Sequence, residues 1–335
     1  MQQKLKEVAE VLLGAQCIAI ISHKNPDGDT LGSQLALGNG LKALGKEVIL
    51  YNRDTISQKF YFIAGADGVQ RYEDGMDLPD TVVFVDCAEP QLAGFHVTDA
   101  VLAGKTIVNI DHHASNKHYG TWNYVVDTAG ANCQNIYHVL NAMQIPVTKD
   151  IATALYTGLS TDTGNFMYDN VSSETLHIAA ELKDIGANTD AVRLKLYESS
   201  SKKKIALLKH ILNNLHISED GYSAWSTISY QVIAELQPES TDIDGLINTI
   251  KDIEGVEIAM LFRGVEEQRT KVSLRSKVWA DVNQIAGLFG GGGHVRASGA
   301  TIEGDVEYSA AFMAPAVQKI VDQHFANAEV CATQD

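Results

Sequence analysis

The stretch CIAIISHKNPDGDTLGS, residues 17–33, decides the fold. Its first six residues are apolar or small, which is typical of a buried strand, and a loop bent by proline and glycine follows at once. A helix is predicted from about Thr30 to Leu44. A strand, a polar loop and a helix in this order form the repeating unit of an α/β sheet. The loop itself holds three potential metal ligands, His23, Asp27 and Asp29.

The same pattern recurs further along the chain. Apolar stretches at 82–85 and 107–110 come directly before Asp86 and before Asp111-His112-His113, and a less strand-like stretch at 155–161 precedes Asp162. In an open parallel sheet, residues just past the carboxyl ends of the strands converge on one crevice. We therefore predict an N-terminal doubly wound, mainly parallel α/β sheet that carries a metal-dependent hydrolytic site. Further helices are predicted at 1–14, 132–143 and 151–159.

The character of the sequence changes after about residue 190. A helical stretch at 190–215 contains the polar cluster Ser199–Lys204, which is typical of an exposed connector. Four strand-like segments follow, at 216–218, 222–229, 256–263 and 270–275. We predict a catalytic domain at 1–190, a helical linker at 191–215 and a smaller mixed α/β domain at 216–335, with the active site in the cleft between the two domains.

Composition narrows the class of protein. A chain of 335 residues is long enough for two domains, and its net charge of −16 argues against a broad basic face that grips long polyanions. Any nucleic-acid substrate should therefore be short. The four cysteines are far apart and form no CxxC pair, the first residues lack a signal-peptide pattern, and no stretch approaches about 18 apolar residues. We expect a soluble cytoplasmic protein.

The His and Asp clusters can supply ligands for two divalent metals. Asp86 can bridge the two ions, and the excess of carboxylates favours Mn²⁺ or Mg²⁺. Two such ions would activate a water and hold both the attacking and the leaving oxygen of a phosphoryl transfer. Taken singly, an Asp at a strand end is more often a turn residue, so the prediction depends on the convergence of all the clusters. The expected ligands are His23, Asp27, Asp29, Asp86, His112 and Asp162.

A glycine run, Gly290–Gly293, comes shortly after a predicted helix at 282–288 and directly before His294. Glycines expose backbone N–H groups and allow a ligand to approach closely, so an anion-binding loop is physically reasonable, although flexible linkers have the same composition. The nearby Arg275 and Arg296 favour phosphate as the anion, because a guanidinium binds phosphate with two parallel hydrogen bonds.

Five motifs, HKNPDGDTLGS, VDCAEP, NIDHHASN, GLSTDTGNF and GGGGHVRASG, closely resemble in this order the DHH phosphoesterase superfamily with its DHH-associated C-terminal domain. The resemblance covers nearly the whole chain and is strongest to the NrnA-type members. It implies a 3′-to-5′ exonuclease that degrades very short RNA and releases 5′-mononucleotides. The same enzyme would dephosphorylate 3′-phosphoadenosine 5′-phosphate (pAp). A homodimer is also implied.

The resemblance further implies a role for each candidate residue. Two Mn²⁺ ions, with Mg²⁺ or Co²⁺ as alternatives, would be held by His23, Asp27 and Asp86 and by Asp29, Asp86, His112 and Asp162. The catalytic set would be Asp86, His113 at the scissile phosphate, and Asp111, which would orient a ligand histidine. The other phosphate of the substrate would be bound by Arg275, Gly291, Gly292, Gly293 and His294, which would thereby measure its length.

Other functions remain open at this point. Cleavage of linear or cyclic dinucleotides fits the same short pocket. A manganese-dependent inorganic pyrophosphatase shares the metal motifs, but the glycine loop disfavours it, and a RecJ-type exonuclease on long DNA would require a larger and more basic chain. A nucleotide sensor without turnover would be indicated by the loss of a ligand, and no ligand is missing.

Overall fold

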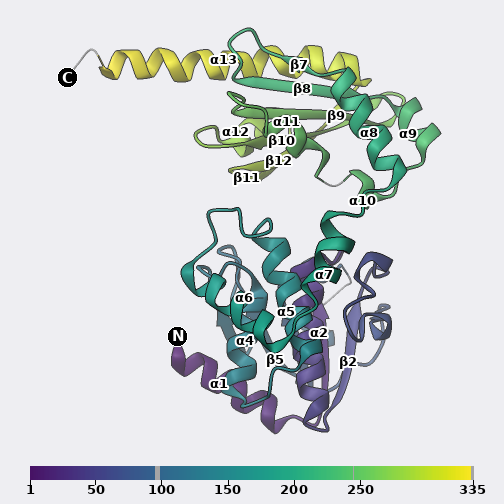
Figure 1. The fold of residues 1–335 in the computed structure, drawn as a ribbon, viewed down its shortest axis with the longest axis vertical. Coiled ribbons are helices and arrows are strands. Elements are labelled where there is room, and N and C mark those ends of the chain that lie inside the picture. The colour runs from purple at the N-terminus through teal and green to yellow at the C-terminus, as the bar shows by residue number, and fades with distance from the viewer. Residues whose placement is uncertain (95–98, 244, 333–335) are drawn as a thin grey trace. The chain divides into compact units, whose positions relative to one another are not determined.

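The computed structural model describes residues 1–94, 99–243 and 245–332. The chain divides into two compact units, Met1–Ser199 and Ser200–Asp335, and the division falls inside the stretch predicted as a linker (Figure 1). Each unit has its own sheet and its own hydrophobic core, so each is described by itself. Within the described residues, none of the helices combines the length and the apolar character that a membrane span requires.

The first unit contains a six-stranded sheet in the order β3-β2-β1-β4-β5-β6, and every pair of neighbours is parallel. The predicted parallel sheet is therefore confirmed. The strand order reverses between β1 and β4, and open α/β sheets bind ligands at such a reversal. The strands are β1 (Cys17–Ser22), β2 (Glu47–Asn52), β3 (Gln70–Arg71), β4 (Thr81–Val85), β5 (Thr106–Asp111) and β6 (Trp122–Val125).

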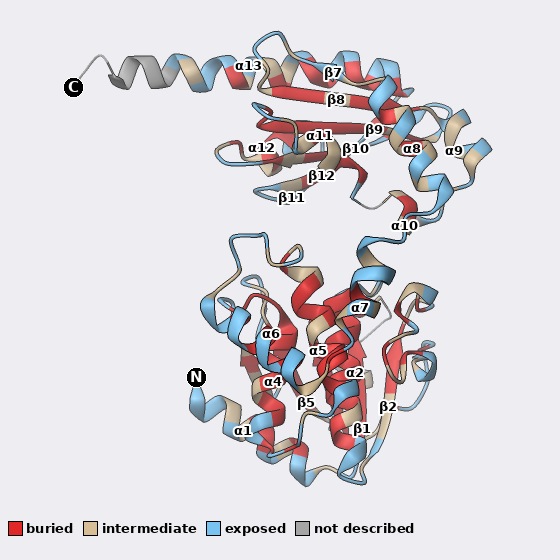
Figure 2. Cartoon of the chain, viewed as in Figure 1, coloured by how far each residue is buried: buried red, intermediate tan, exposed pale blue. Residues whose placement is uncertain are grey.

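Two apolar layers cover this sheet, because successive strand residues point to opposite faces. Ile18 and Ile20 of β1 pack in the larger core with the helices, whereas Ala19 and Ile21 pack in a smaller core on the other face. Figure 2 shows α2 and α5 buried along most of their length. The larger core is formed with α1 (Gln2–Gly14), α2 (Gly28–Ala43), α4 (Asn132–Ala142), α5 (Lys149–Asp162) and α6 (Ser173–Ile185). Short helices lie at Gln58–Phe60, Ala66–Gly68, Pro90–Ala93 and, as α3, Asp99–Leu102.

Four predicted helices of the first unit are confirmed as α1, α2, α4 and α5. Residues 155–161, the less strand-like stretch before Asp162, form the later turns of α5, so Asp162 ends a helix that begins close to the start predicted for 151–159. Thr148 caps α5 with its side chain, and the buried Ile151, Leu155 and Leu159 recur at the spacing of a helix. Strands β3 and β6 and helix α6 were not predicted.

The second unit contains a mixed six-stranded sheet in the order β11-β12-β10-β9-β8-β7, in which only β8 and β9 are parallel neighbours. A mixed α/β fold is therefore confirmed here, and the four predicted segments form the first four strands. The strands are β7 (His216–Ile217), β8 (Ser223–Ile228), β9 (Ile258–Glu266), β10 (Arg269–Ser276), β11 (Gly292–His294) and β12 (Ala297–Glu303). The helices are α8 (Lys202–Asn213), α9 (Tyr230–Leu236), α10 (Ser240–Ile243), α11 (Leu246–Lys251), α12 (Val282–Gly287) and α13 (Val306–Ala332).

The predicted helical stretch at 190–215 is interrupted. Helix α7 (Thr189–Val192) continues into a π-helical turn, Arg193–Tyr197, and α8 begins only after Ser201, whose side chain caps it. Leu207 and Ile211 of α8 are buried in the core of the second unit. Helix α8 is thus part of the second unit, whereas the functional division of the chain into a catalytic and a substrate-binding domain stays a prediction.

Candidate metal centre

The loop from β1 to α2 presents its three predicted ligands at the start of a helix. Asp27 is the N-cap of α2, and its Oδ1 accepts hydrogen bonds of 3.0 Å from the backbone N–H groups of Asp29 and Thr30. Asp27 is exposed, whereas Asp29, in the first turn of the helix, is buried. Capping therefore fixes the direction of the Asp27 side chain, and the helix carries Asp29 inward.

The end of α5 reaches this loop because Gly28 leaves room for it. A Cβ atom at Gly28 would lie 2.5 Å from the side chain of Thr161, the residue before Asp162. Helices α2 and α5 therefore meet at a position where only glycine fits. This close approach brings Asp162 to the loop that holds Asp29, although the two residues are far apart in sequence.

Asp86 lies at the centre of the cluster, directly after β4. Its backbone has a positive φ of 52°, and its N–H donates to the carbonyl of Ile110 at the end of β5. Asp86 Oδ2 lies 3.4 Å from His23 Nε2, and Asp86 Oδ1 lies 3.5 Å from His112 Nε2 and 3.7 Å from His113 Nδ1. One carboxylate thus contacts histidines that follow β1 and β5, on both sides of β4.

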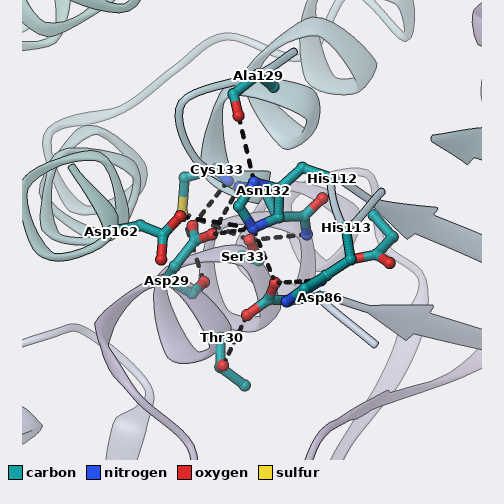
Figure 3. Close-up of polar contacts among 12 residues, drawn as sticks. Asp29, Thr30, Ser33, Asp86, His112, His113, Ala129, Asn132, Cys133 and Asp162 are labelled. Atoms are coloured by element: carbon teal, nitrogen blue, oxygen red, sulfur yellow. Dashed lines mark hydrogen bonds and ion pairs between the residues drawn. The ribbon is translucent and has the colours of Figure 1, made fainter. Parts of the chain in front are cut away.

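The six predicted metal ligands are brought together in the first unit. Figure 3 shows Asp29, Asp86, His112 and Asp162 of this set. Potential ligand atoms of each of three groups lie within 4.8 Å of one another. Asp86 belongs to two of the groups, and so does His112, as expected for a centre of two adjacent ions. The groups are His23, Asp27 and Asp86; Asp29, His112 and Asp162; and Asp86, His112 and His113.

The residues fit a metal also by their polar contacts. Asp86 Oδ1 is buried and accepts no hydrogen bond from the described residues. A buried carboxylate oxygen without a donor is costly unless a cation or a proton compensates it. The set of imidazoles and carboxylates suits Mn²⁺ and other divalent ions at the harder end of the first-row series.

The cluster concentrates negative charge in a buried place. Burial raises the pKa of the Asp29 carboxyl well above its usual range, and the charges of Asp86 and Asp162 add to this effect. Burial likewise raises the pKa of Asp162 to about 6. Burial alone would lower the histidine values, but contacts with Asp86 outweigh it and raise the pKa of His23 to about 9 and that of His112 to about 10.

Asp86 behaves in the opposite way to Asp29. Burial would raise its pKa, but the contacts with His112 and His23 lower the pKa below the usual range of a carboxyl. Without cations, protonated histidines therefore compensate the Asp86 charge, and divalent cations bound in the cluster would take over this role.

The start of α4 holds Asp29, and sequence reasoning missed this contact. The backbone N–H groups of Asn132 and Cys133 donate to Asp29 Oδ2 and Oδ1 at 2.6 and 2.8 Å (Figure 3). A helix N-terminus stabilises a carboxylate through these unpaired donors and its dipole. Just before α4, the carbonyl of Ala129 lies 3.2 Å from His112 Nδ1 and orients that ring. The predicted start of a helix at residue 132 was the only signal of this anchor in the sequence.

Thr30 is a second residue that sequence reasoning missed. Its hydroxyl oxygen lies 2.6 Å from His23 Nε2. The hydroxyl can donate a hydrogen bond to Asp86 Oδ2, at 2.8 Å, or to Asp27 Oδ1, at 3.0 Å. The hydroxyl thus contacts all three members of one ligand group. The capping spacing of Asp27 and Thr30, three residues apart at a helix start, was a usable signal.

His113 is oriented by a buried polar chain. Its Nδ1 lies 2.8 Å from Oδ1 of Asp111, which is fully buried, and the Asp111 Oδ2 accepts a 2.5 Å hydrogen bond from Asn116. Asn116 also donates to Asn109 on β5. The orienting contact of Asp111 is therefore made to His113, whereas His112 is oriented by a backbone carbonyl.

The predicted phosphate-binding residues line one groove of the second unit, with a volume of about 630 Å³. Arg296 is not among the lining residues. Its guanidinium donates to the carbonyls of Val278 and Ala280, so it braces the loop before α12. The predicted members of the groove are Arg275, Gly291, Gly292, Gly293 and His294, and the lining also includes Lys271, Ser273 and Thr301.

Comparison with known proteins agrees with this geometry. The model of the DHH family N-terminal domain matches residues 17–159, and that of the DHHA1 domain matches residues 227–324. A bifunctional oligoribonuclease and PAP phosphatase NrnA of Thermus thermophilus is 32% identical over 306 residues, which are 90% of this chain and 89% of the relative. The NrnA of Bacillus subtilis is 27% identical over 85% of this chain and 89% of its own.

A solved structure has the same fold over almost the whole chain. The crystal structure of an exopolyphosphatase-related protein from Bacteroides fragilis superposes with a TM-score of 0.87 at 25% identity. The match covers 95% of this chain and 96% of that one.

Proposed function

The chain belongs to the DHH family, and on this premise we propose that it is a metal-dependent phosphoesterase that hydrolyses very short oligonucleotides and pAp. The observation that carries the proposal is the cluster of six potential ligands at the β1/β4 reversal, among them Asp86, whose buried Oδ1 accepts no hydrogen bond from the described residues. The relatives named as oligoribonuclease and PAP phosphatase support the choice of substrate.

Two divalent cations, with Mn²⁺ preferred, are proposed for the cluster. His23, Asp27 and Asp86 would hold one, and Asp29, Asp86, His112 and Asp162 the other, in keeping with the groups of adjacent ligand atoms. Bound there, the cations would supply Lewis acidity at the phosphoryl group and acidify the attacking water. Asp29 is held for this role by the start of α4, and His112 by the carbonyl of Ala129.

His113 is proposed to contact the scissile phosphate. In the reaction, water adds to phosphorus, the bond from phosphorus to the leaving oxygen breaks, and the leaving oxygen gains a proton. Asp111 holds His113 Nδ1, which leaves Nε2 to donate that proton. For an oligonucleotide cut from its 3′ end, the leaving oxygen is the 3′ oxygen of the preceding nucleotide, and the product is a 5′-mononucleotide.

The glycine groove is proposed to bind a second phosphate of the substrate. Arg275 and His294 supply cationic or hydrogen-bonding groups, and the backbone of residues 291–293 allows close approach. Binding of this phosphate would set the length of the preferred substrate.

The test is hydrolysis of 5′-labelled RNA of two to twenty-four nucleotides, with pAp, linear and cyclic dinucleotides and pyrophosphate alongside, in Mn²⁺, in Mg²⁺ and in chelator. We expect metal-dependent turnover concentrated on two- to five-mers and pAp, with products that shorten from the 3′ end. Turnover of pyrophosphate alone would replace the proposal with a pyrophosphatase. Turnover of dinucleotides alone would replace it with a dinucleotide phosphodiesterase.

A cytoplasmic location and a homodimer are also proposed. Cys17, Cys87 and Cys133 are free thiols, as a reducing compartment would favour. Light scattering at micromolar concentration would give the mass of a dimer, and a monomer mass would reject that part of the proposal.

A further inference from the structure

Lys271 extends the glycine groove along β10. Lys271, Ser273 and Arg275 alternate in the strand with Val272 and Leu274, and alternate strand residues point to opposite faces. Val272 and Leu274 are buried in the core, so the other three side chains share the face that lines the groove. The row therefore has one cationic side chain at each end.

The residues that line the groove between the two cationic side chains are small. In the pairing of β10 with β12, Ser273 lies opposite Gly299, and Gly299 in turn lies opposite Gly292 of β11. Lys271 lies opposite Thr301, whose side chain also lines the groove. Small residues at the centre leave room for a sugar-phosphate chain to lie against the sheet between the two ends.

Lys271 is exposed, and its positive charge is available in the groove. The acidic residues at this end of the sheet, Glu266 and Glu303, are paired with Arg269, at 3.5 and 3.8 Å. Among the described residues, no carboxylate lies within ion-pair distance of Lys271. Its ammonium group can therefore bind an anion without first breaking a salt bridge.

We propose that Lys271, with the hydroxyl of Thr301, forms a second phosphate subsite for substrates of three or more nucleotides. This inference rests on the proposed function and assigns to the groove a role in substrate length. Strand residues rise about 3.4 Å each, so the backbone of Lys271 lies about 14 Å along β10 from that of Arg275. A dinucleotide or pAp has one phosphate besides the scissile one, and that phosphate is assigned to Arg275, whereas a longer strand has a further phosphodiester that Lys271 can bind.

The experiment compares Lys271→Gln with the wild-type protein and with Lys319→Gln. Lys319 is an exposed lysine of α13, which packs on the other face of the sheet, so its variant removes the same charge elsewhere in the unit. KM and kcat are measured on pAp, a dinucleotide, a trinucleotide and a pentanucleotide. Anisotropy of labelled di- and pentanucleotides with chelator-treated protein measures binding without turnover.

We expect Lys271→Gln to raise KM for the tri- and pentanucleotide about threefold to tenfold, as for the loss of one exposed charge contact, with kcat unchanged. Values for pAp and the dinucleotide should stay within about twofold, and Lys319→Gln should change none of them. The Kd from anisotropy should rise for the pentanucleotide and not for the dinucleotide, and the rise should be smaller in high salt.

Three results would overturn the subsite. Equal losses on all lengths would assign Lys271 to the same phosphate as Arg275. No loss on any length, in turnover and in anisotropy, would leave Lys271 outside the binding path. If the wild-type protein neither cleaves nor binds the oligonucleotides, the proposed function is rejected together with the subsite. If the wild-type protein cleaves all lengths and the Lys271→Gln variant does so equally well, only the subsite is rejected.

Discussion

Asp86 is the residue on which the centre depends, because both of its oxygens face potential partners and one of them has no donor. We predict that Asp86→Asn lowers kcat by about a thousandfold or more, since a neutral amide cannot bridge two cations. The folded protein should persist, with a circular dichroism spectrum that matches the wild type. Turnover within about tenfold of wild type in saturating Mn²⁺ would exclude a bridging role.

Asp111 and His113 form a hydrogen-bonded pair in which the carboxylate orients the imidazole. We predict that Asp111→Asn lowers kcat about tenfold to a hundredfold with little change in KM, because the imidazole loses the partner that orients it. Manganese affinity, measured by calorimetry, should stay near the wild-type value, since Asp111 is not among the proposed ligands. In a double-mutant cycle with His113→Ala, the two losses should not add. Additive losses would show that Asp111 acts on another group.

At the scale of elements, the site depends on the contact between α2 and α5. We predict that Gly28→Ala destabilises the first unit by about 1–3 kcal/mol, because the new methyl group would overlap the Thr161 side chain. Urea unfolding measures the change. Gly14→Ala is the matched control, since a Cβ there meets nothing within 4 Å. Thr161→Ala should recover part of the loss in the double variant, and no recovery would locate the strain elsewhere.

The elements that could be predicted from the sequence are those with a local signal. The strand before His23 is a continuous apolar run, and helix α2 begins at a capping residue, so both were predictable. Strand β3 consists of two exposed residues, and β12 begins with the small residues Ala297, Ser298 and Gly299, so neither has a clear apolar strand pattern. Their places in the sheets depend on pairing with neighbouring strands. The helix that carries Asp162 was predicted at 151–159, but its last turn, which ends at Asp162, lay beyond the predicted bounds.

The parts of the site that escaped prediction involve the backbone. Asp29 is held by N–H groups at the start of α4, and His112 by the carbonyl of Ala129, and neither contact depends on a recognisable side chain. Thr30 lies in the first turn of a capped helix, where threonine is ordinary, so the sequence did not indicate that its hydroxyl also contacts His23 and Asp86. The groove residue Lys271 lies on a strand that was predicted, but its place beside Thr301 follows only from the register between β10 and β12.

At the scale of the whole molecule, two separate cores predict two partly independent unfolding transitions. Divalent metal should raise the melting temperature of the transition of the first unit alone, because all six proposed ligands belong to it. A ligand present at a hundred times its Kd stabilises the folded state by about 2.7 kcal/mol. Differential scanning calorimetry with Mn²⁺ and with chelator measures the shift, and Asp86→Asn should reduce it. An equal shift of both transitions would contradict a metal centre confined to the first unit.

Titration of Mn²⁺ into chelator-treated protein, with release of mononucleotide from a dinucleotide followed in the same sample, tests most directly whether the six side chains form a hydrolytic two-metal centre. We expect no turnover in chelator, and turnover that rises until two equivalents of manganese are bound. The Asp86→Asn variant should bind less metal and remain inactive. Product release in the presence of chelator, or full turnover with Asp86 replaced, would contradict the assignment of the centre.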